Sequence, residues 1–161
     1  MLREVKSEKA VTLVFEWLTS DYALLTALTP SEERELRALL DYVSLDPRIP
    51  RVDEPEAIGL VLAKSRGLVL LTENRGARRI TQYHPEYRSV KVWGALRVLA
   101  EAAKAGVIKA DTPAAFKKAV SEYSKDTLHL FSEKDLRAVL SEYYGEHALS
   151  HTRGALRGVE A

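Results

Sequence analysis

The chain has 161 residues, of which 46% are hydrophobic and 29% charged, as in an ordinary soluble globular domain. It has no cysteine, which excludes disulfides, thiolate metal sites and cysteine nucleophiles. Its net charge of +1 gives no global argument for nucleic acid or membrane binding, so such an argument must rest on local patches. No apolar run approaches the ~18 residues of a membrane span, and the first residues do not build a signal peptide. We therefore expect a cytoplasmic protein without membrane contact.

The first third of the chain predicts two elements. Residues 10–18 are ambiguous between strand and helix, and their β-branched and aromatic side chains favour a strand. Thr29-Pro30-Ser31-Glu32 is typical of a helix start, with a threonine cap, a proline in the first turn and a glutamate that closes a capping box. Helical spacing of apolar residues follows at Leu36, Leu39, Leu40 and Val43.

A helix and a strand come next. Pro47 and Pro50 bracket a loop, and Asp53 can cap a helix that turns Ile58, Val61 and Leu62 inward and ends at Gly67. Residues 68–71 are wholly apolar, which is typical of a strand buried on both faces of a parallel sheet. We expect this strand at the centre of the sheet.

The second half alternates again between the two types of element. We expect a helix over 75–82, a strand over 90–93 and a helix over 95–105 that ends at Gly106. Two further helices are expected, one from Thr112-Pro113 to about Tyr123 and one that begins at Ser132 and Asp135 and stops at Gly145. Strands that alternate with helices predict an α/β fold with a mainly parallel sheet, a three-layer sandwich, in one domain over 1–145. Residues 146–161 show no apolar period and are expected to be a flexible tail.

Three acidic residues are candidates for a metal site. Glu54 and Glu56 lie in the first turn of a predicted helix, and Glu73 directly follows the predicted central strand. Open α/β sheets bind ligands at the carboxyl ends of their strands, and clustered carboxylates suit Mg²⁺ or Mn²⁺. Acidic residues are also common in a first helical turn because they complement the helix dipole, and this alternative stays open.

A local excess of basic residues follows Glu73. Arg75, Arg78 and Arg79 are spaced so that two or three of them share one side of a short helix, which could meet a phosphate backbone. The alternative is a solvated helix face or pairing with nearby glutamates.

Three segments in order resemble the PIN-domain family, in a subgroup whose motifs read G-E-x-E-A-I, L-L-x-D-D-R-x-A-R-R and V-x-G-x-L-x-V-L. Here the segments are EPEAI at 54–58, LLTENRGARR at 70–79 and VWGALRVL at 92–99. The resemblance covers about residues 50–145. It implies a metal-dependent ribonuclease, often the toxin of a toxin–antitoxin pair, whose acidic cluster holds Mg²⁺ or Mn²⁺ and ionises the attacking water.

By position in these motifs, the resemblance implies that Glu54, Glu56, Glu73 and Asn74 are the catalytic residues. It implies metal ligation by Glu4, Glu54 and Glu73, and contact with nucleic acid by Arg75, Arg78 and Arg79. Two features depart from the family: Asn74 stands where the family has a second Asp, and no opening strand with D-x-[ST]-x-L is found. The fold implied is therefore PIN-like and truncated at its N-terminus, with weak or absent metal binding.

Three hypotheses remain open from the sequence. The chain is a PIN-like ribonuclease or a remnant of one, a non-catalytic PIN-like module that binds RNA or a protein such as an antitoxin, or an unrelated α/β domain. Because a missing strand leaves an exposed sheet edge, and such edges invite pairing, a homodimer is also expected. Little or no ribonuclease activity is expected of this chain.

Overall fold

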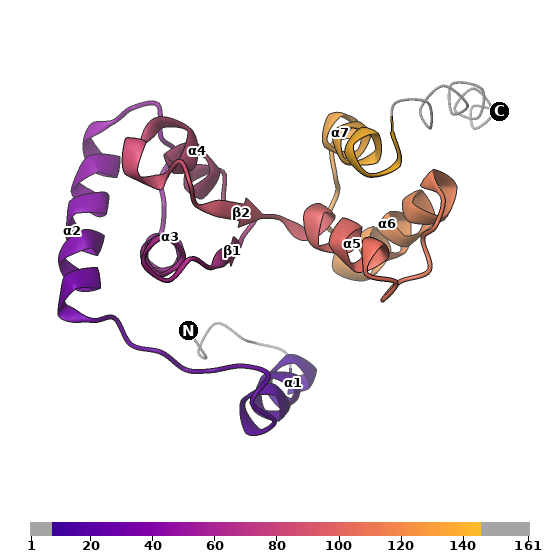
Figure 1. The fold of residues 1–161 in the computed structure, drawn as a ribbon, viewed down its shortest axis with the longest axis horizontal. Helices are drawn as coiled ribbons and strands as arrows, with labels where there is room; N and C mark the ends of the chain where they lie inside the picture. The colour runs from indigo at the N-terminus through magenta and orange to yellow at the C-terminus, as the bar shows by residue number, and fades with distance from the viewer. Residues whose placement is uncertain (1–7, 146–161) are drawn as a thin grey trace. The chain divides into compact units, whose positions relative to one another are not determined.

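The computed structural model describes residues 8–145 and shows a mixed α/β chain that is mainly helical (Figure 1). The predicted metal ligand Glu4 and the predicted tail at 146–161 lie outside these residues. The elements in order are α1 (Glu8–Thr19), α2 (Pro30–Leu45), α3 (Glu54–Arg66), β1 (Val69–Leu71), α4 (Arg75–Tyr83), the 3-10 helix η2 (Pro85–Tyr87), β2 (Lys91–Trp93), α5 (Ala95–Lys104), α6 (Pro113–Thr127) and α7 (Glu133–Tyr144). Every predicted helix from residue 30 onward is present, and strands form within the predicted segments 68–71 and 90–93.

The chain divides into two compact units, and the two short strands contribute to both. Of the described residues, the first unit holds 8–70 and 74–92, and the second holds 71–73 and 93–145. The sequence predicts a single domain over 1–145, and that boundary stays a prediction. Each unit is described below by itself.

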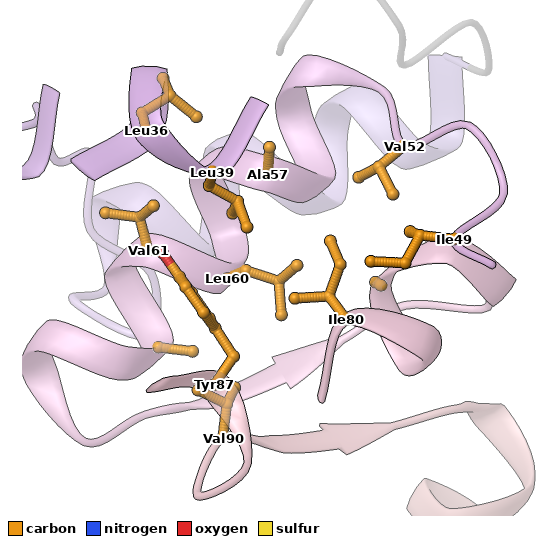
Figure 2. Close-up of a cluster of buried hydrophobic side chains, with 12 residues drawn as sticks. Leu36, Leu39, Ile49, Val52, Ala57, Leu60, Val61, Ile80, Tyr87 and Val90 are labelled. Atoms are coloured by element: carbon orange, nitrogen blue, oxygen red, sulfur yellow. The ribbon is translucent and has the colours of Figure 1, made fainter. Parts of the chain in front are cut away.

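The first unit is built on α2 and α3. Thr29 caps α2 as predicted, because its side chain accepts from Glu32 N–H while the Glu32 carboxylate accepts from Thr29 N–H. This reciprocal capping box satisfies two backbone donors at the helix start. Apolar residues of both helices then meet those of α4, as Figure 2 shows for Leu39, Leu60 and Ile80, which are all buried.

The end of α3 is fixed by a glycine. Gly67 adopts the left-handed conformation (φ 66°) and its N–H bonds to Ala63 O, as predicted for a helix C-cap. Gly59, earlier on α3, allows a close approach of Leu70, since a Cβ at this position would lie 2.6 Å from a Leu70 methyl carbon. These two glycines let β1 pack its inward side chain, Leu70, against the helix.

The prediction of a strand buried on both faces is wrong for residues 68–71. A strand does form, over Val69–Leu71, but Leu68, Val69 and Leu71 are exposed and Leu70 alone is half-buried. Within the described residues the sheet consists of β1 and β2 in parallel, so β1 has one neighbouring strand and no central place. A wholly apolar run signals two covered faces only when other elements are present to cover them.

The preference for a strand at residues 10–18 is also wrong, because α1 forms a helix over Glu8–Thr19. A helix of 12 residues pairs its backbone groups within itself, whereas a strand needs a neighbour to accept its hydrogen bonds. The length of the apolar run, more than the residue types, separates the two structures here.

The second unit is a cluster of α5, α6 and α7. Phe116 and Leu140 are completely buried, and Leu96 and Ala100 from α5 complete the cluster. Thr112 and Ser132 cap α6 and α7 by accepting from Ala115 N–H and Asp135 N–H, as their positions predict. Helix α6 continues four residues beyond the predicted end, to Thr127.

Candidate functional site

The acidic residues of the first motif lie at the start of α3. Asp53 is the N-cap but makes no capping hydrogen bond, and its carboxylate is 3.3 Å from Arg51 Nε. Glu54 is exposed and Glu56 half-buried in the first turn. Both therefore complement the positive end of the α3 dipole, whatever else they do.

The residues of the second motif, Glu73 and Asn74, both act as helix caps. Asn74 Oδ1 accepts from Gly76 N–H (2.7 Å) and Ala77 N–H (3.1 Å) and so caps α4. Glu73 Oε1 accepts from Ala95 N–H (2.5 Å) at the first turn of α5, where the N-cap residue Gly94 offers no side chain. Each side chain therefore satisfies backbone donors that the helix itself leaves unpaired.

These contacts bear on the predicted metal centre. Among residues 8–145, no three acidic or histidine side chains form a group that could hold a metal ion. Glu54 and Glu56 belong to the first compact unit and Glu73 to the second, so their convergence on one site stays a prediction. Binding of Mg²⁺ or Mn²⁺ by Glu4, Glu54 and Glu73 therefore also stays a prediction.

The arginines of the second motif lie on α4, which contains no acidic residue. Arg75 and Arg79 are exposed and Arg78 is half-buried. Since residues four apart lie on one helix face, the first two share a side of α4. Arg79 Nη1 donates to two neutral oxygens, Tyr83 OH (3.0 Å) and Gln82 Oε1 (3.4 Å), which orient its guanidinium without cancelling its charge.

A residue that the sequence did not single out extends this face. Arg48, in the loop between α2 and α3, places its guanidinium 4.7 Å from the centre of the Tyr83 ring, and that of Arg79 lies 5.7 Å from the same centre. Asp46 holds Arg48 from the other side through three hydrogen bonds, the shortest 2.6 Å. The spacing of Arg79 and Tyr83 along α4 was the available signal, whereas the approach of Arg48 depends on the loop path. We call Arg48, Arg75, Arg79 and Tyr83 the arginine patch.

A polar network beside the first core was also not predicted. Lys64 Nζ lies 2.7 Å from Glu35 Oε1 and 2.6 Å from Glu86 Oε2, and Tyr87 OH donates to Glu35 (2.9 Å). Desolvation alone would lower the pKa of Lys64, but these two carboxylates raise it. His84 packs against the Tyr87 ring, and its burial lowers its pKa. Every charge in this network has a partner of opposite sign, which indicates a structural role for the network.

A hollow of about 330 Å³ lies in the second unit beside Glu73. Its walls are mainly apolar and include Leu71, Trp93, Val98 and Tyr123. Its size is at the lower end of small-molecule sites, but few polar groups converge on it.

The chain matches no protein-family model, no curated protein and no solved structure. None of the helices in the described part of the chain is long and apolar enough to cross a membrane. Support for the arginine patch therefore comes from its own geometry.

Proposed function

We propose that this chain is a cytoplasmic PIN-like domain of the three-layer α/β type that binds single-stranded RNA through the arginine patch. The observation that carries this proposal is the arrangement of Arg48, Arg75 and Arg79 around α4 and Tyr83. The motif resemblance at 54–58, 70–79 and 92–99 supports the choice of RNA as the ligand.

The chemistry of the patch suits a phosphate backbone. A guanidinium offers several N–H donors in a plane that matches phosphate oxygens, and pre-orientation reduces the entropy lost on binding. The neutral partners of Arg79 supply that pre-orientation. Asp46 already pairs with Arg48, but no acidic residue of α4 competes for the donors of Arg75 and Arg79, so these two residues give the patch its positive charge. Such contacts position a nucleic acid without reading its sequence.

Binding is favoured over cleavage by the roles of Glu73 and Asn74. Both cap helices, and Asn74 brings no charge to a metal. Metal-assisted cleavage needs enough ligands to fix the ion and to ionise water near neutral pH. A PIN-like ribonuclease dependent on Mg²⁺ or Mn²⁺ is the competing function, and the assay below separates the two.

The test is the anisotropy of a labelled oligouridine titrated with the whole chain over a series of salt concentrations. We expect the double variant Arg75→Ala/Arg79→Ala to weaken binding and to reduce the slope of log K against log salt by about 1.4, since each lost phosphate contact on a single strand contributes about 0.7. The control is Arg37→Ala, which removes an exposed arginine of α2 and should leave both quantities unchanged.

Three results would count against this function. Unchanged RNA binding by the double variant would show that the arginine patch does not contact the RNA. Cleavage of the RNA with Mn²⁺ that is abolished by EDTA and by Glu54→Gln would identify an active nuclease. An acidic peptide that binds the patch while RNA does not would point to a protein partner of the antitoxin kind.

A further inference from the structure

The segment before α2 exposes an unusual amount of apolar surface. Helix α1 and the residues that follow it expose six large hydrophobic side chains: Leu13, Phe15, Trp17, Tyr22, Leu24 and Leu25. We call residues 11–25 the apolar arm. At roughly 200 Å² for each fully exposed large side chain, these residues expose roughly 700 Å² per chain. Monomeric proteins seldom leave a contiguous apolar surface of this size uncovered.

Apolar side chains cover most of the circumference of α1. Helical spacing puts Val11, Val14, Phe15 and Leu18 on one face, and Leu13 and Trp17 on a second. Thr12, Glu16 and Thr19 share the remaining polar side. A helix that is apolar on most sides is stable in water only when other chain surface packs around it.

The base of the arm is fixed to the first unit. Arg66 donates from Nη1 to Thr26 Oγ1 (2.5 Å) and from Nη2 to Ala27 O (3.0 Å), while its Nε and Nη2 also bond the Glu32 carboxylate. Leu28, directly after, packs against the core cluster. Residues 11–25 thus start from an anchored position and carry their apolar side chains outward.

We infer that the apolar arm is a dimer interface that pairs with the same arm of a second copy, with the two α1 helices crossing near Val14. The exposed area supports this occupant, because roughly 700 Å² per chain approaches the ~800 Å² that each partner buries in a stable interface. One patch that meets itself across a two-fold axis closes the assembly at two copies. The charge of the arm argues against a membrane surface, since residues 11–25 contain Glu16 and Asp21 and no Lys or Arg, whereas interfacial helices are rich in Lys and Arg.

The first test is the mass of the whole chain by light scattering after size exclusion. We expect a particle of twice the 18.0 kDa chain mass, and a single-chain mass for Phe15→Glu/Trp17→Glu. The control is Leu45→Glu, which adds one glutamate at a leucine of α2 that is 82% exposed and lies outside the arm, and it should remain dimeric. Circular dichroism checks that each variant keeps its helices.

The second test fixes the geometry. Because the chain has no cysteine, Val14→Cys introduces a single thiol, and mild oxidation by a disulfide reagent should link two chains by one disulfide. Leu45→Cys should not form this link beyond the level set by random collision. A monomeric wild type, a dimer that survives Phe15→Glu/Trp17→Glu, or a dimer that Val14→Cys does not cross-link would each overturn the inference. None of these outcomes depends on RNA binding.

Discussion

Both compact units are mainly helical, but they differ in how far their ion-paired carboxylates are exposed. In the first unit the carboxylate of Glu32 is only 7% exposed and lies between Arg66, Ser65 and the start of α2. In the second unit Arg97 bonds Glu142, whose side chain is 55% exposed, and pairs with Glu101 at 3.2 Å. The first unit therefore buries the carboxylate of the ion pair that joins α2 to α3, although Arg66 is 32% exposed, whereas both carboxylates that pair with Arg97 in the second unit are partly exposed.

This difference shows which contacts should matter for stability. Breaking a buried pair leaves a charge without compensation, whereas exposed pairs contribute little because water and salt screen them. Arg66 lowers the pKa of Glu32 well below its usual range, with further contributions from Ser65 and Thr29. Tyr143 and then Arg97 lower the pKa of Glu101. Glu32 and Glu101 therefore both favour the charged form, although Glu32 is more deeply buried than Glu101.

The largest expected effects come from the two hydrophobic clusters. Leu60→Ala should cost about 2–5 kcal/mol and Phe116→Ala about 3–5 kcal/mol of unfolding free energy, because both side chains are completely buried. If each unit is stable by itself, amide exchange should accelerate in α2 and α3 for the first variant and in α6 and α7 for the second. Val107→Ala, at an exposed position, serves as the control. Equal acceleration across both units in either variant would show that the chain unfolds as one.

The next effect concerns acid. The folded pKa of Glu32 lies below its unfolded value of about 4.5, so its stabilising contribution is complete above that pH and disappears as the pH falls below it. Glu32→Gln should therefore lower the melting temperature at neutral pH, and the difference from wild type should shrink toward about pH 3. Glu101→Gln should also lower the melting temperature at neutral pH, but by a smaller amount, because Glu101 is 30% exposed. A larger loss for Glu101→Gln than for Glu32→Gln would reverse the comparison.

The smallest expected effects separate two threonine caps. Thr29→Ala removes one half of the capping box in the first unit, and Thr112→Ala removes a single capping bond in the second. Each should cost about 1 kcal/mol, with Thr29→Ala the smaller because its backbone N–H still donates to the Glu32 carboxylate and holds the start of α2. Urea unfolding with fluorescence detection measures both values. Equal losses of unfolding free energy in the two variants would mean that the bond from Thr29 N–H to the Glu32 carboxylate adds no stability.

Local patterns were sufficient to predict the helices from residue 30 onward. The capping box at Thr29, the left-handed Gly67 and the serine cap at Ser132 all depend on neighbours within a few residues, and all three were predicted correctly. The errors at α1 and at Leu68–Leu71 share a cause. Whether an apolar run is a strand, and whether that strand is covered, depends on segments distant in sequence, which residue type alone does not reveal.

In the candidate site, too, the features that depend on neighbouring residues were predicted and those that depend on distant residues were not. Positions next to helix starts were identified from sequence, since Asn74 and Glu73 do lie at the first turns of helices, although as caps. The arginine face of α4 follows from helical spacing. The partners of Glu32 and the approach of Arg48 to Tyr83 join residues more than thirty positions apart, and no spacing rule encodes them. Convergence of Glu54, Glu56 and Glu73 remains a prediction for the same reason.

The cap at Asn74 has a consequence for how this position can change over generations. Asparagine and aspartate cap helices about equally well, so the start of α4 would accept Asp at this position with little change in folding. One substitution, Asn74→Asp, would then add the charge that the PIN-like motif carries here without disturbing the backbone. Folding therefore leaves this position free to drift between a neutral cap and an acidic one, and selection on chemistry alone would decide which residue is kept.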